Sequence, residues 1–314
     1  MSSSSRPDAN MAAAALAEVE EGEELEHRRS REQALGEGAP AERGGWVTAL
    51  WALPGSAWLG FFLLAPLVFI VLVSFWTYEV GAKSGFTEKW TLANYGTIFH
   101  SSTYWHNMLG SFETSLIAVA ACLVFGFPIA YFLALKVQDL RNQIALFIIA
   151  LAPFWTSFLV RSVAWTYPLS DVLSKFGVAT PSTASVRLAM IQLYILFMIT
   201  PLFFTLSQVD RTALEAARDL GGNWWQTFRI VIVPQVLPGA VIGSIFIFVL
   251  TMGEYGTVLV VGQNYVQSVG TIVNSYITNA VQYPQGAAAA VLLVLALIAG
   301  VFVITRFSNL REDL

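Results

Sequence analysis

Three ionisable residues, Glu113, Arg161 and Glu254, lie inside long apolar stretches of the chain. A charged side chain in hydrocarbon costs at least about 2.5 kcal/mol, so each should face the interior of a helix bundle and is a candidate functional residue. At a rise of about 1.5 Å per residue, all three fall in the same outer third of a bilayer. We therefore expect either a structural bridge between Arg161 and Glu254 or a gate in which all three take part.

The aromatic residues near these charges suggest what such a gate would pass. Trp155 and Trp165 flank Arg161, and Tyr255 follows Glu254. Even if Arg161 pairs with Glu254, the count of ionisable residues inside the spans leaves Glu113 as a carboxylate without a partner in this chain. Carboxylates attract an ammonium group and indole faces hold it by cation–π contact, so the set suits a cationic solute.

Six apolar runs of about twenty residues must position these side chains, and each is long enough to cross a hydrocarbon core of about 30 Å. Hydrophobic residues make up 56% of the chain and charged residues 12%, which excludes a soluble globular domain. We predict an all-α, polytopic membrane bundle of six transmembrane helices. The runs lie near Trp58–Tyr78, Ser111–Leu135, Ile144–Tyr167, Leu188–Leu206, Leu237–Val261 and Ala287–Thr305.

Charge and composition divide the chain and orient it. Residues 1–45 are acidic and poor in aromatic residues, which predicts a disordered tail before a permease domain at 46–307 and a short tail at 308–314. Lys and Arg gather on one side of the alternating spans, the side that carries both tails and the loop 210–238. We expect a multi-pass protein of a bacterial inner or plasma membrane with both termini in the cytoplasm.

The pattern of the loop from Asp210 to Gly239 predicts two short helices joined by glycines. The first has apolar residues at helical spacing, and its start fits either a capping box of Thr212 with Glu215 or a cap at Asp210 one turn earlier. Gly221 supplies a left-handed stop. A second helix, capped by Asn223, should end before Pro234.

Parts of this loop resemble the cytoplasmic signature of the permease subunits of binding-protein-dependent ABC importers. The matching residues are Glu215-Ala216-Ala217, Gly221 and Val231-Ile232-Val233-Pro234, where Val stands in place of the family's Ile and Leu. The resemblance implies a coupling helix that seats in a cleft of a separate ATPase. The simpler alternative is that Glu215 only caps its own helix. The coupling residues it implies are Glu215, Ala216, Ala217, Asp219, Gly221 and Pro234.

Within that family, Pro153–Trp165, Asn94-Tyr95 and Gly253-Glu254-Tyr255 look like the spermidine/putrescine type, and the resemblance spans about Trp58 to Phe307. It implies inward transport of a polyamine. Permeases for iron, thiamine, phosphonate or opine share much of this pattern and remain alternatives, as does an ion-coupled secondary transporter or a membrane anchor or sensor. The pathway residues we expect are Glu113, Trp155, Arg161, Trp165, Glu254 and Tyr255.

The chain carries no motif for chemistry of its own. It has no phosphate-binding loop, zinc-protease helix or serine-hydrolase elbow, one cysteine, Cys122, and three scattered histidines. We therefore expect no catalytic residue, no metal, no cofactor and no nucleic acid partner. The resemblance implies a second homologous permease, two copies of an ATPase subunit, and an extracytoplasmic solute-binding protein that delivers the substrate.

Overall fold

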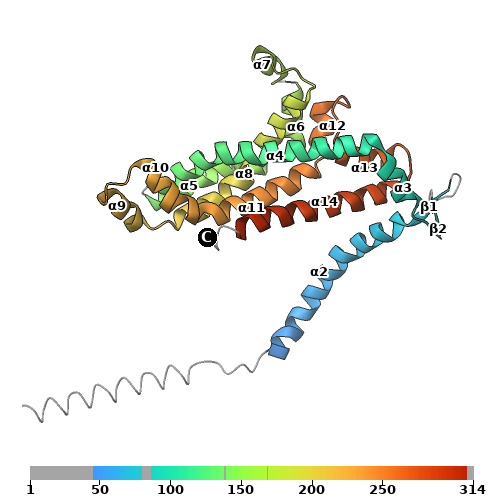
Figure 1. Ribbon diagram of the computed structural model, residues 1–314, viewed down its shortest axis with the longest axis horizontal. Coiled ribbons are helices and arrows are strands. Elements are labelled where there is room, and N and C mark those ends of the chain that lie inside the picture. The colour runs from blue at the N-terminus through green and yellow to red at the C-terminus, as the bar shows by residue number, and fades with distance from the viewer. Residues whose placement is uncertain (1–44, 80–85, 138, 168, 310–314) are drawn as a thin grey trace, which may run out of the picture. The chain divides into compact units, whose positions relative to one another are not determined.

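The computed structural model describes residues 45–79, 86–137, 139–167 and 169–309, and the chain divides into two units, Met1–Ala65 and Pro66–Leu314 (Figure 1). Of the first unit, the described residues all belong to helix α2 (Gly45–Ser74), which runs on into the second unit. The predicted tails, 1–45 and 308–314, lie almost wholly outside the described residues.

The second unit is helical apart from one small hairpin at its start. Two strands pair antiparallel, with Trp76 opposite Trp90 and Tyr78 opposite Phe86. The elements in order are β1 (Trp76–Tyr78), β2 (Phe86–Trp90), α3 (Ala93–His100), α4 (Ser102–Tyr131), the π-helix η1 (Phe132–Lys136), α5 (Leu140–Leu151), the 3-10 helix η2 (Ala152–Trp155), α6 (Phe158–Thr166), α7 (Ser170–Lys175), α8 (Thr183–Ser207), α9 (Arg211–Asp219), α10 (Trp224–Thr227), the π-helix η3 (Phe228–Ile232), α11 (Val233–Met252), α12 (Gly256–Gly262), α13 (Val269–Thr278) and α14 (Tyr283–Asn309).

Five helical stretches among the described residues are long and apolar enough to cross a membrane, and a sixth span is formed if a bent pair of helices counts as one. The pair is Leu140–Trp155 followed by Phe158–Thr166, and the two helices meet at 76°. The sequence predicts a single span there, at Ile144–Tyr167. The all-α membrane bundle is therefore as predicted, but its third span is broken.

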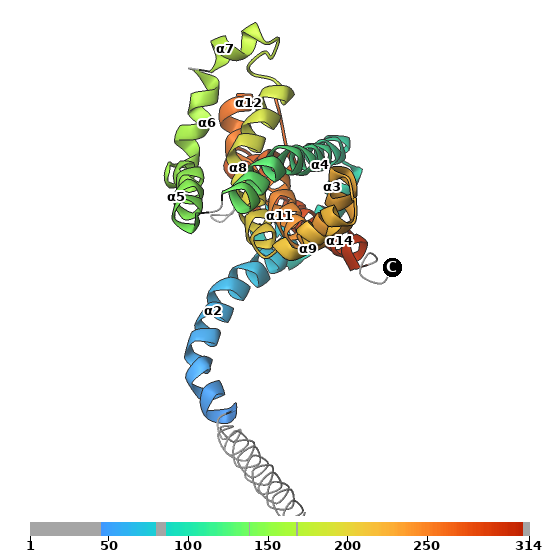
Figure 2. The same ribbon diagram turned by 90° about the vertical axis from the view of Figure 1, so that its left-hand side faces the viewer.

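Helices α4, α8 and α11 pack against one another and form the centre of the bundle, and α14 lies along α11 (Figures 1 and 2). Small residues permit the close approach. A Cβ atom on Gly243 of α11 would lie 2.7 Å from the Met198 sulfur of α8, so only glycine fits at that crossing. The core between these helices is made of buried aliphatic residues together with Met198, Phe203 and Cys122.

Hydrogen bonds fasten the hairpin and the short helix α3 to the bundle. The Asn94 side chain donates to the carbonyl oxygens of Ser74 at 2.8 Å and Trp76 at 2.9 Å. The buried Tyr104 hydroxyl donates to the Ala289 carbonyl at 2.9 Å, which ties the start of α4 to α14. These bonds satisfy polar groups where the helices turn, and they set the frame around the sites below.

Candidate functional site

Two spans break at the same pocket. The third span bends between η2 and α6 at Thr156 and Ser157. The predicted fifth span, Leu237–Val261, leaves helical geometry between α11 and α12 at Gly253–Tyr255, and the continuous stretch that can cross a membrane there is Trp224–Met252. The breaks face each other, since a Cβ atom on Gly256 would lie 3.1 Å from a ring carbon of Phe158. The two glycines around Glu254 allow either close helix approach or local unwinding, and the structure shows local unwinding at Gly253–Tyr255. Between the breaks lies a cavity of about 570 Å³, which we call the bent-span pocket.

Glu254 is fixed in this pocket by neighbours from two helices. Its carboxylate accepts a hydrogen bond from the Tyr194 hydroxyl of α8, and its Oε1 accepts the backbone amide of Thr257 at 2.7 Å. The second bond satisfies an amide in the first turn of α12, so Glu254 also ends the break between α11 and α12. Its own carbonyl accepts from the Ser268 hydroxyl at 2.9 Å, which adds the start of α13 to the site.

Arg161 lines the same pocket but is left without a partner. Its Nε and Nη1 atoms are buried, and neither has a hydrogen-bond partner within the described part of the chain. The bridge to Glu254 that the sequence allows is not formed among these residues, and the Glu254 carboxylate binds Tyr194 and Thr257 instead. Arg161 thus brings into the bent-span pocket a guanidinium with two nitrogen atoms that have no hydrogen-bond partner among the described residues.

Of the three predicted aromatic residues, two border the pocket. Trp155 and Tyr255 both line it and are 80% and 51% exposed, so their rings stand at its rim. Trp165 does not line it. It is half-buried against the cluster around Val186 and Met190, and its indole N–H donates to the Gln192 side-chain oxygen at 3.4 Å.

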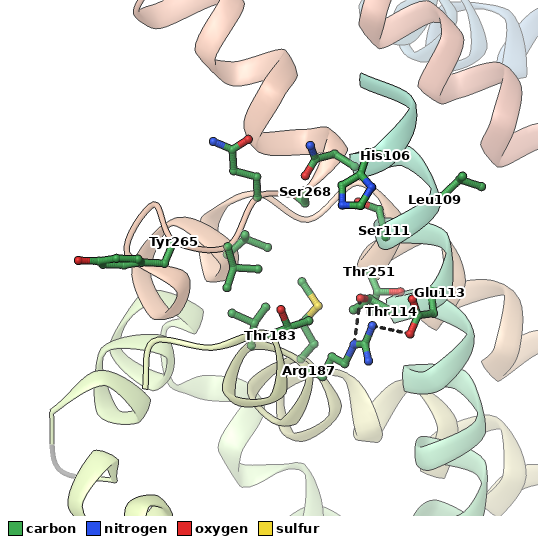
Figure 3. Close-up of a pocket in the computed structure, with 17 residues that line it drawn as sticks. His106, Leu109, Ser111, Glu113, Thr114, Thr183, Arg187, Thr251, Tyr265 and Ser268 are labelled. Carbon is green, nitrogen blue, oxygen red and sulfur yellow. Dashed lines mark hydrogen bonds and ion pairs between the residues drawn. The ribbon is translucent and has the colours of Figure 1, made fainter. Parts of the chain in front are cut away.

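Glu113 lies in a different cavity, of about 600 Å³, between α4, the first turns of α8 and the connection from α12 to α13. We call it the Glu113 pocket (Figure 3). The Glu113 Oε1 atom is 2.8 Å from Arg187 Nη2, and Arg187 Nε donates to the Thr114 hydroxyl at 3.2 Å. Figure 3 shows the Arg187 side chain reaching from α8 towards α4, with His106 and Ser268 on the far side of the cavity.

The expectation that Glu113 has no partner in this chain is therefore wrong. The predicted fourth span begins at Leu188 and leaves Arg187 in the connection before it, whereas α8 begins at Thr183 and carries Arg187 in its second turn. From there the side chain reaches the second span. The excess of acid inferred from the sequence disappears with this pair, since Glu113 is matched by Arg187 and Glu254 shares its pocket with Arg161.

The predicted pair of short helices is present between the fourth and fifth spans. Helix α9 ends in a left-handed Gly221 with φ of +79°, and the Gly222 amide donates to the Ala217 carbonyl at 3.0 Å. These are the bonds of a glycine C-cap, as the sequence predicts. Asn223 caps α10 through a reciprocal pair of bonds with Gln226, at 2.8 and 2.9 Å.

The start of α9 follows one of the two predicted alternatives. The Asp210 carboxylate accepts the Thr212 amide at 2.8 Å and its hydroxyl at 2.7 Å, whereas Glu215 makes no capping bond in the described residues. The bond from the Thr212 hydroxyl, with that from its amide, lowers the pKa of Asp210. Glu215 is exposed, and so are Ala216 and Asp219, while Ala217 is half-buried. A stripe of free side chains therefore runs along α9.

The chain stays helical through Pro234, where the second short helix was expected to stop. Helix α10 ends at Thr227, but η3 follows directly, and the Val233 amide donates to the Phe228 carbonyl five residues back. This wider turn lets Pro234, which has no amide hydrogen, occupy the start of α11.

Sequence reasoning missed Tyr194 and Arg187, the two side chains that hold the pocket carboxylates. Tyr194 gives one signal, a hydroxyl in the middle of an apolar span that must find a partner. Arg187 gives none, because its role depends on where α8 begins. In the ranges 45–79, 86–137, 139–167 and 169–309, no group of three or more His, Cys, Asp or Glu residues is arranged to hold a metal ion.

Comparison with known proteins gives clear relatives, although no family model matches the chain. The spermidine/putrescine transport system permease protein PotB of Salmonella typhimurium (strain SL1344) is 30% identical over 270 residues, which cover 81% of this chain and 91% of the relative. The protein of the same name from Haemophilus influenzae is 29% identical over 266 residues, with coverage of 81% and 91%.

A solved structure shares the fold. A chain of a bacterial ABC transporter involved in the import of the acidic polysaccharide alginate superposes with a TM-score of 0.57 at 17% sequence identity. The match covers 84% of this chain and 95% of that chain. Its low identity limits what it shows to the arrangement of the helices.

Proposed function

The chain belongs to the spermidine/putrescine-type permease subunits of ABC importers, and from this premise we propose that it carries a polyamine into the cytoplasm. As such a permease it is a multi-pass protein of the inner membrane and a transport component rather than an enzyme. It works with an ATPase that is a separate subunit and with a solute-binding protein. The 30% identity over 81% of the chain is the observation that carries the choice of substrate.

The bent-span pocket supplies groups that suit an ammonium ion. Glu254 offers a carboxylate whose position is set by Tyr194 and Thr257, and Trp155 and Tyr255 present aromatic faces at the rim. An ammonium beside a carboxylate and an aromatic ring is stabilised by charge and by cation–π contact. We assign Glu254, Trp155 and Tyr255 to the substrate pathway, with Arg161 as a gate residue of the same pocket and Trp165 behind it, bracing α6 against α8.

The Glu113 pocket is proposed as the outer part of the same pathway. Glu113 keeps 62% of its side chain exposed while one oxygen binds Arg187, so the carboxylate remains accessible to a cation. Arg187 is held from a second side by Thr114, and a cation that binds Glu113 has to compete with this pair. The pocket would then admit a polyamine and weaken the link between the second and fourth spans as it does so.

The exposed stripe of α9 is proposed as the surface that docks on the ATPase. Glu215, Ala216 and Asp219 lie free on that helix, and Ala217, Gly221 and Pro234 give it its shape and its return into α11. The assembly we propose has this chain and a second homologous permease, each seated on one of two ATPase copies. Closure of the ATPase pair would then switch the spans between inward-facing and outward-facing states, with both termini in the cytoplasm.

The test is substrate-stimulated ATP hydrolysis by the complete reconstituted complex. Spermidine and putrescine should stimulate hydrolysis in the presence of the binding protein, and iron, thiamine, a phosphonate and an opine should not. The matched variant Glu254→Gln should assemble but respond only at a much higher polyamine concentration. Stimulation by one of the other solutes in place of polyamines would overturn the proposed substrate and leave the importer assignment standing.

A further inference from the structure

Arg161 has two guanidinium nitrogens that the described part of the chain does not satisfy. Its Nε and Nη1 atoms are buried and have no hydrogen-bond partner in the part of the chain that the structure describes. Burying a charged group without a partner is among the most costly arrangements in a protein, and buried polar atoms are otherwise nearly always paired. In the hydrocarbon layer, where the sequence places Arg161, bulk water is not at hand to replace the missing partner.

Glu254, the carboxylate in the same pocket, makes no ion pair with Arg161. Glu254 accepts the Tyr194 hydroxyl and the Thr257 amide, and the one ion pair among the described residues joins Arg187 to Glu113 in the other pocket. Within the described residues, no acceptor therefore meets the Nε and Nη1 atoms of Arg161.

The surface beside Arg161 also exposes apolar and aromatic side chains. Along α6 the neighbouring apolar side chains Leu159 and Val160 are 48% and 61% exposed, and Trp155 at the rim is 80% exposed. Apolar side chains in a span can face lipid, but lipid cannot satisfy a guanidinium, so the unpaired nitrogens of Arg161 are what indicate a polar partner here. The partner this surface fits is apolar around a single acidic side chain.

We propose that Arg161 is paired by a carboxylate of the second permease subunit, so that the bent-span pocket is completed only when the two permeases assemble. This inference rests on the heterodimer of the proposed function. A guanidinium presents its N–H groups as a fork that matches the two oxygens of a carboxylate. Neutralised in this way, Arg161 no longer repels the polyamine that Glu254 and the aromatic rim are proposed to bind.

The first measurement is the association of the two permeases in the complete complex, as the fraction that co-purifies across a dilution series in detergent, without added polyamine. Arg161→Gln should weaken association at least tenfold, which corresponds to about 1.4 kcal/mol, and Arg161→Lys should weaken it less. The control Arg141→Gln removes an exposed arginine of α5 and should change nothing. Unchanged association in Arg161→Gln would overturn the proposal.

The second measurement identifies the acid and remains informative if Arg161→Gln fails to insert. In Arg161→Glu, each Asp or Glu within the spans of the second permease is replaced by Arg in turn, and assembly is scored. Restored assembly at one position supports the pairing, whereas restoration at none overturns it. If Arg161→Gln assembles normally but an added carboxylate or phosphonate no longer stimulates ATP hydrolysis, Arg161 binds a ligand anion and the proposal is wrong. Because assembly is measured without polyamine, failure of the proposed substrate leaves this result unaffected.

Discussion

Replacing Glu254 by alanine should destabilise the permease through two groups that lose their acceptor. The Tyr194 hydroxyl and the Thr257 amide both donate to this carboxylate. A buried donor left unpaired costs about 1–3 kcal/mol, so the two together predict a loss of about 2–6 kcal/mol in the free energy of unfolding. In Glu254→Gln the single amide oxygen can still accept from Thr257, and the NH2 group can donate to the Tyr194 hydroxyl, so the loss should be only about 2 kcal/mol.

The assay is denaturant unfolding of the purified complex in detergent micelles, with a double-mutant cycle between Glu254→Gln and Tyr194→Phe. Since the two side chains share one bond, their coupling energy should be about 1–3 kcal/mol. The control is Glu88→Gln, a change at an exposed carboxylate of β2 that should lie within about 0.5 kcal/mol of the parent. Additive effects at Glu254 and Tyr194, or a loss below about 1 kcal/mol in Glu254→Ala, would refute the reasoning.

Three further changes test other parts of the structure. Gly221→Val places a β-branched residue at a φ of +79°, which should cost about 1–2 kcal/mol and lower uptake while the protein still reaches the membrane; normal uptake would contradict the coupling role. Gly270→Ala puts a Cβ atom 2.8 Å from the Gly253 carbonyl oxygen and should destabilise by about 1–3 kcal/mol, whereas Gly96→Ala, with open space around it, should not. In a Cys122→Ala background, a cysteine in place of the exposed Leu220, near Gly222, should react with an impermeant label only after the cells are opened, and labelling of intact cells would reverse the proposed topology.

The loop from Asp210 to Gly239 could be predicted because its signals are local. A left-handed stop needs glycine at one position, and a cap needs a short polar side chain at another, so Gly221 and Asn223 define their turns without help from the rest of the fold. The competing caps at Asp210 and Thr212 are both compatible with the sequence. The structure selects Asp210, whose carboxylate reaches both the amide and the hydroxyl of Thr212.

The bend in the third span could not be predicted from hydropathy. Residues 144–167 are apolar on both sides of the bend, and a run of that length scores as one span whether it is straight or folded by 76°. Pro153 indicates a kink, but a proline kink alone leaves the helix continuous. The break is completed by the extended backbone of Thr156 and Ser157, which tertiary contacts with the fifth span determine.

The position of the two breaks is itself an argument about function. Irregular backbone in a membrane-spanning segment is tolerated where it lies within protein or lines a cavity, because its polar groups need partners that hydrocarbon does not supply. Here the Thr156 amide donates to Pro153, the Glu254 amide to Thr251, and the Glu254 carbonyl accepts from Ser268. Each of these hydrogen bonds is made within a few residues or to a neighbouring helix. The breaks are therefore stable while α6 and α12 remain separate from α5 and α11. A pocket bounded by two such breaks can change shape by rotation at its own hinges, without unwinding a helix, and this is the property that a gate in the outer part of a transport pathway requires.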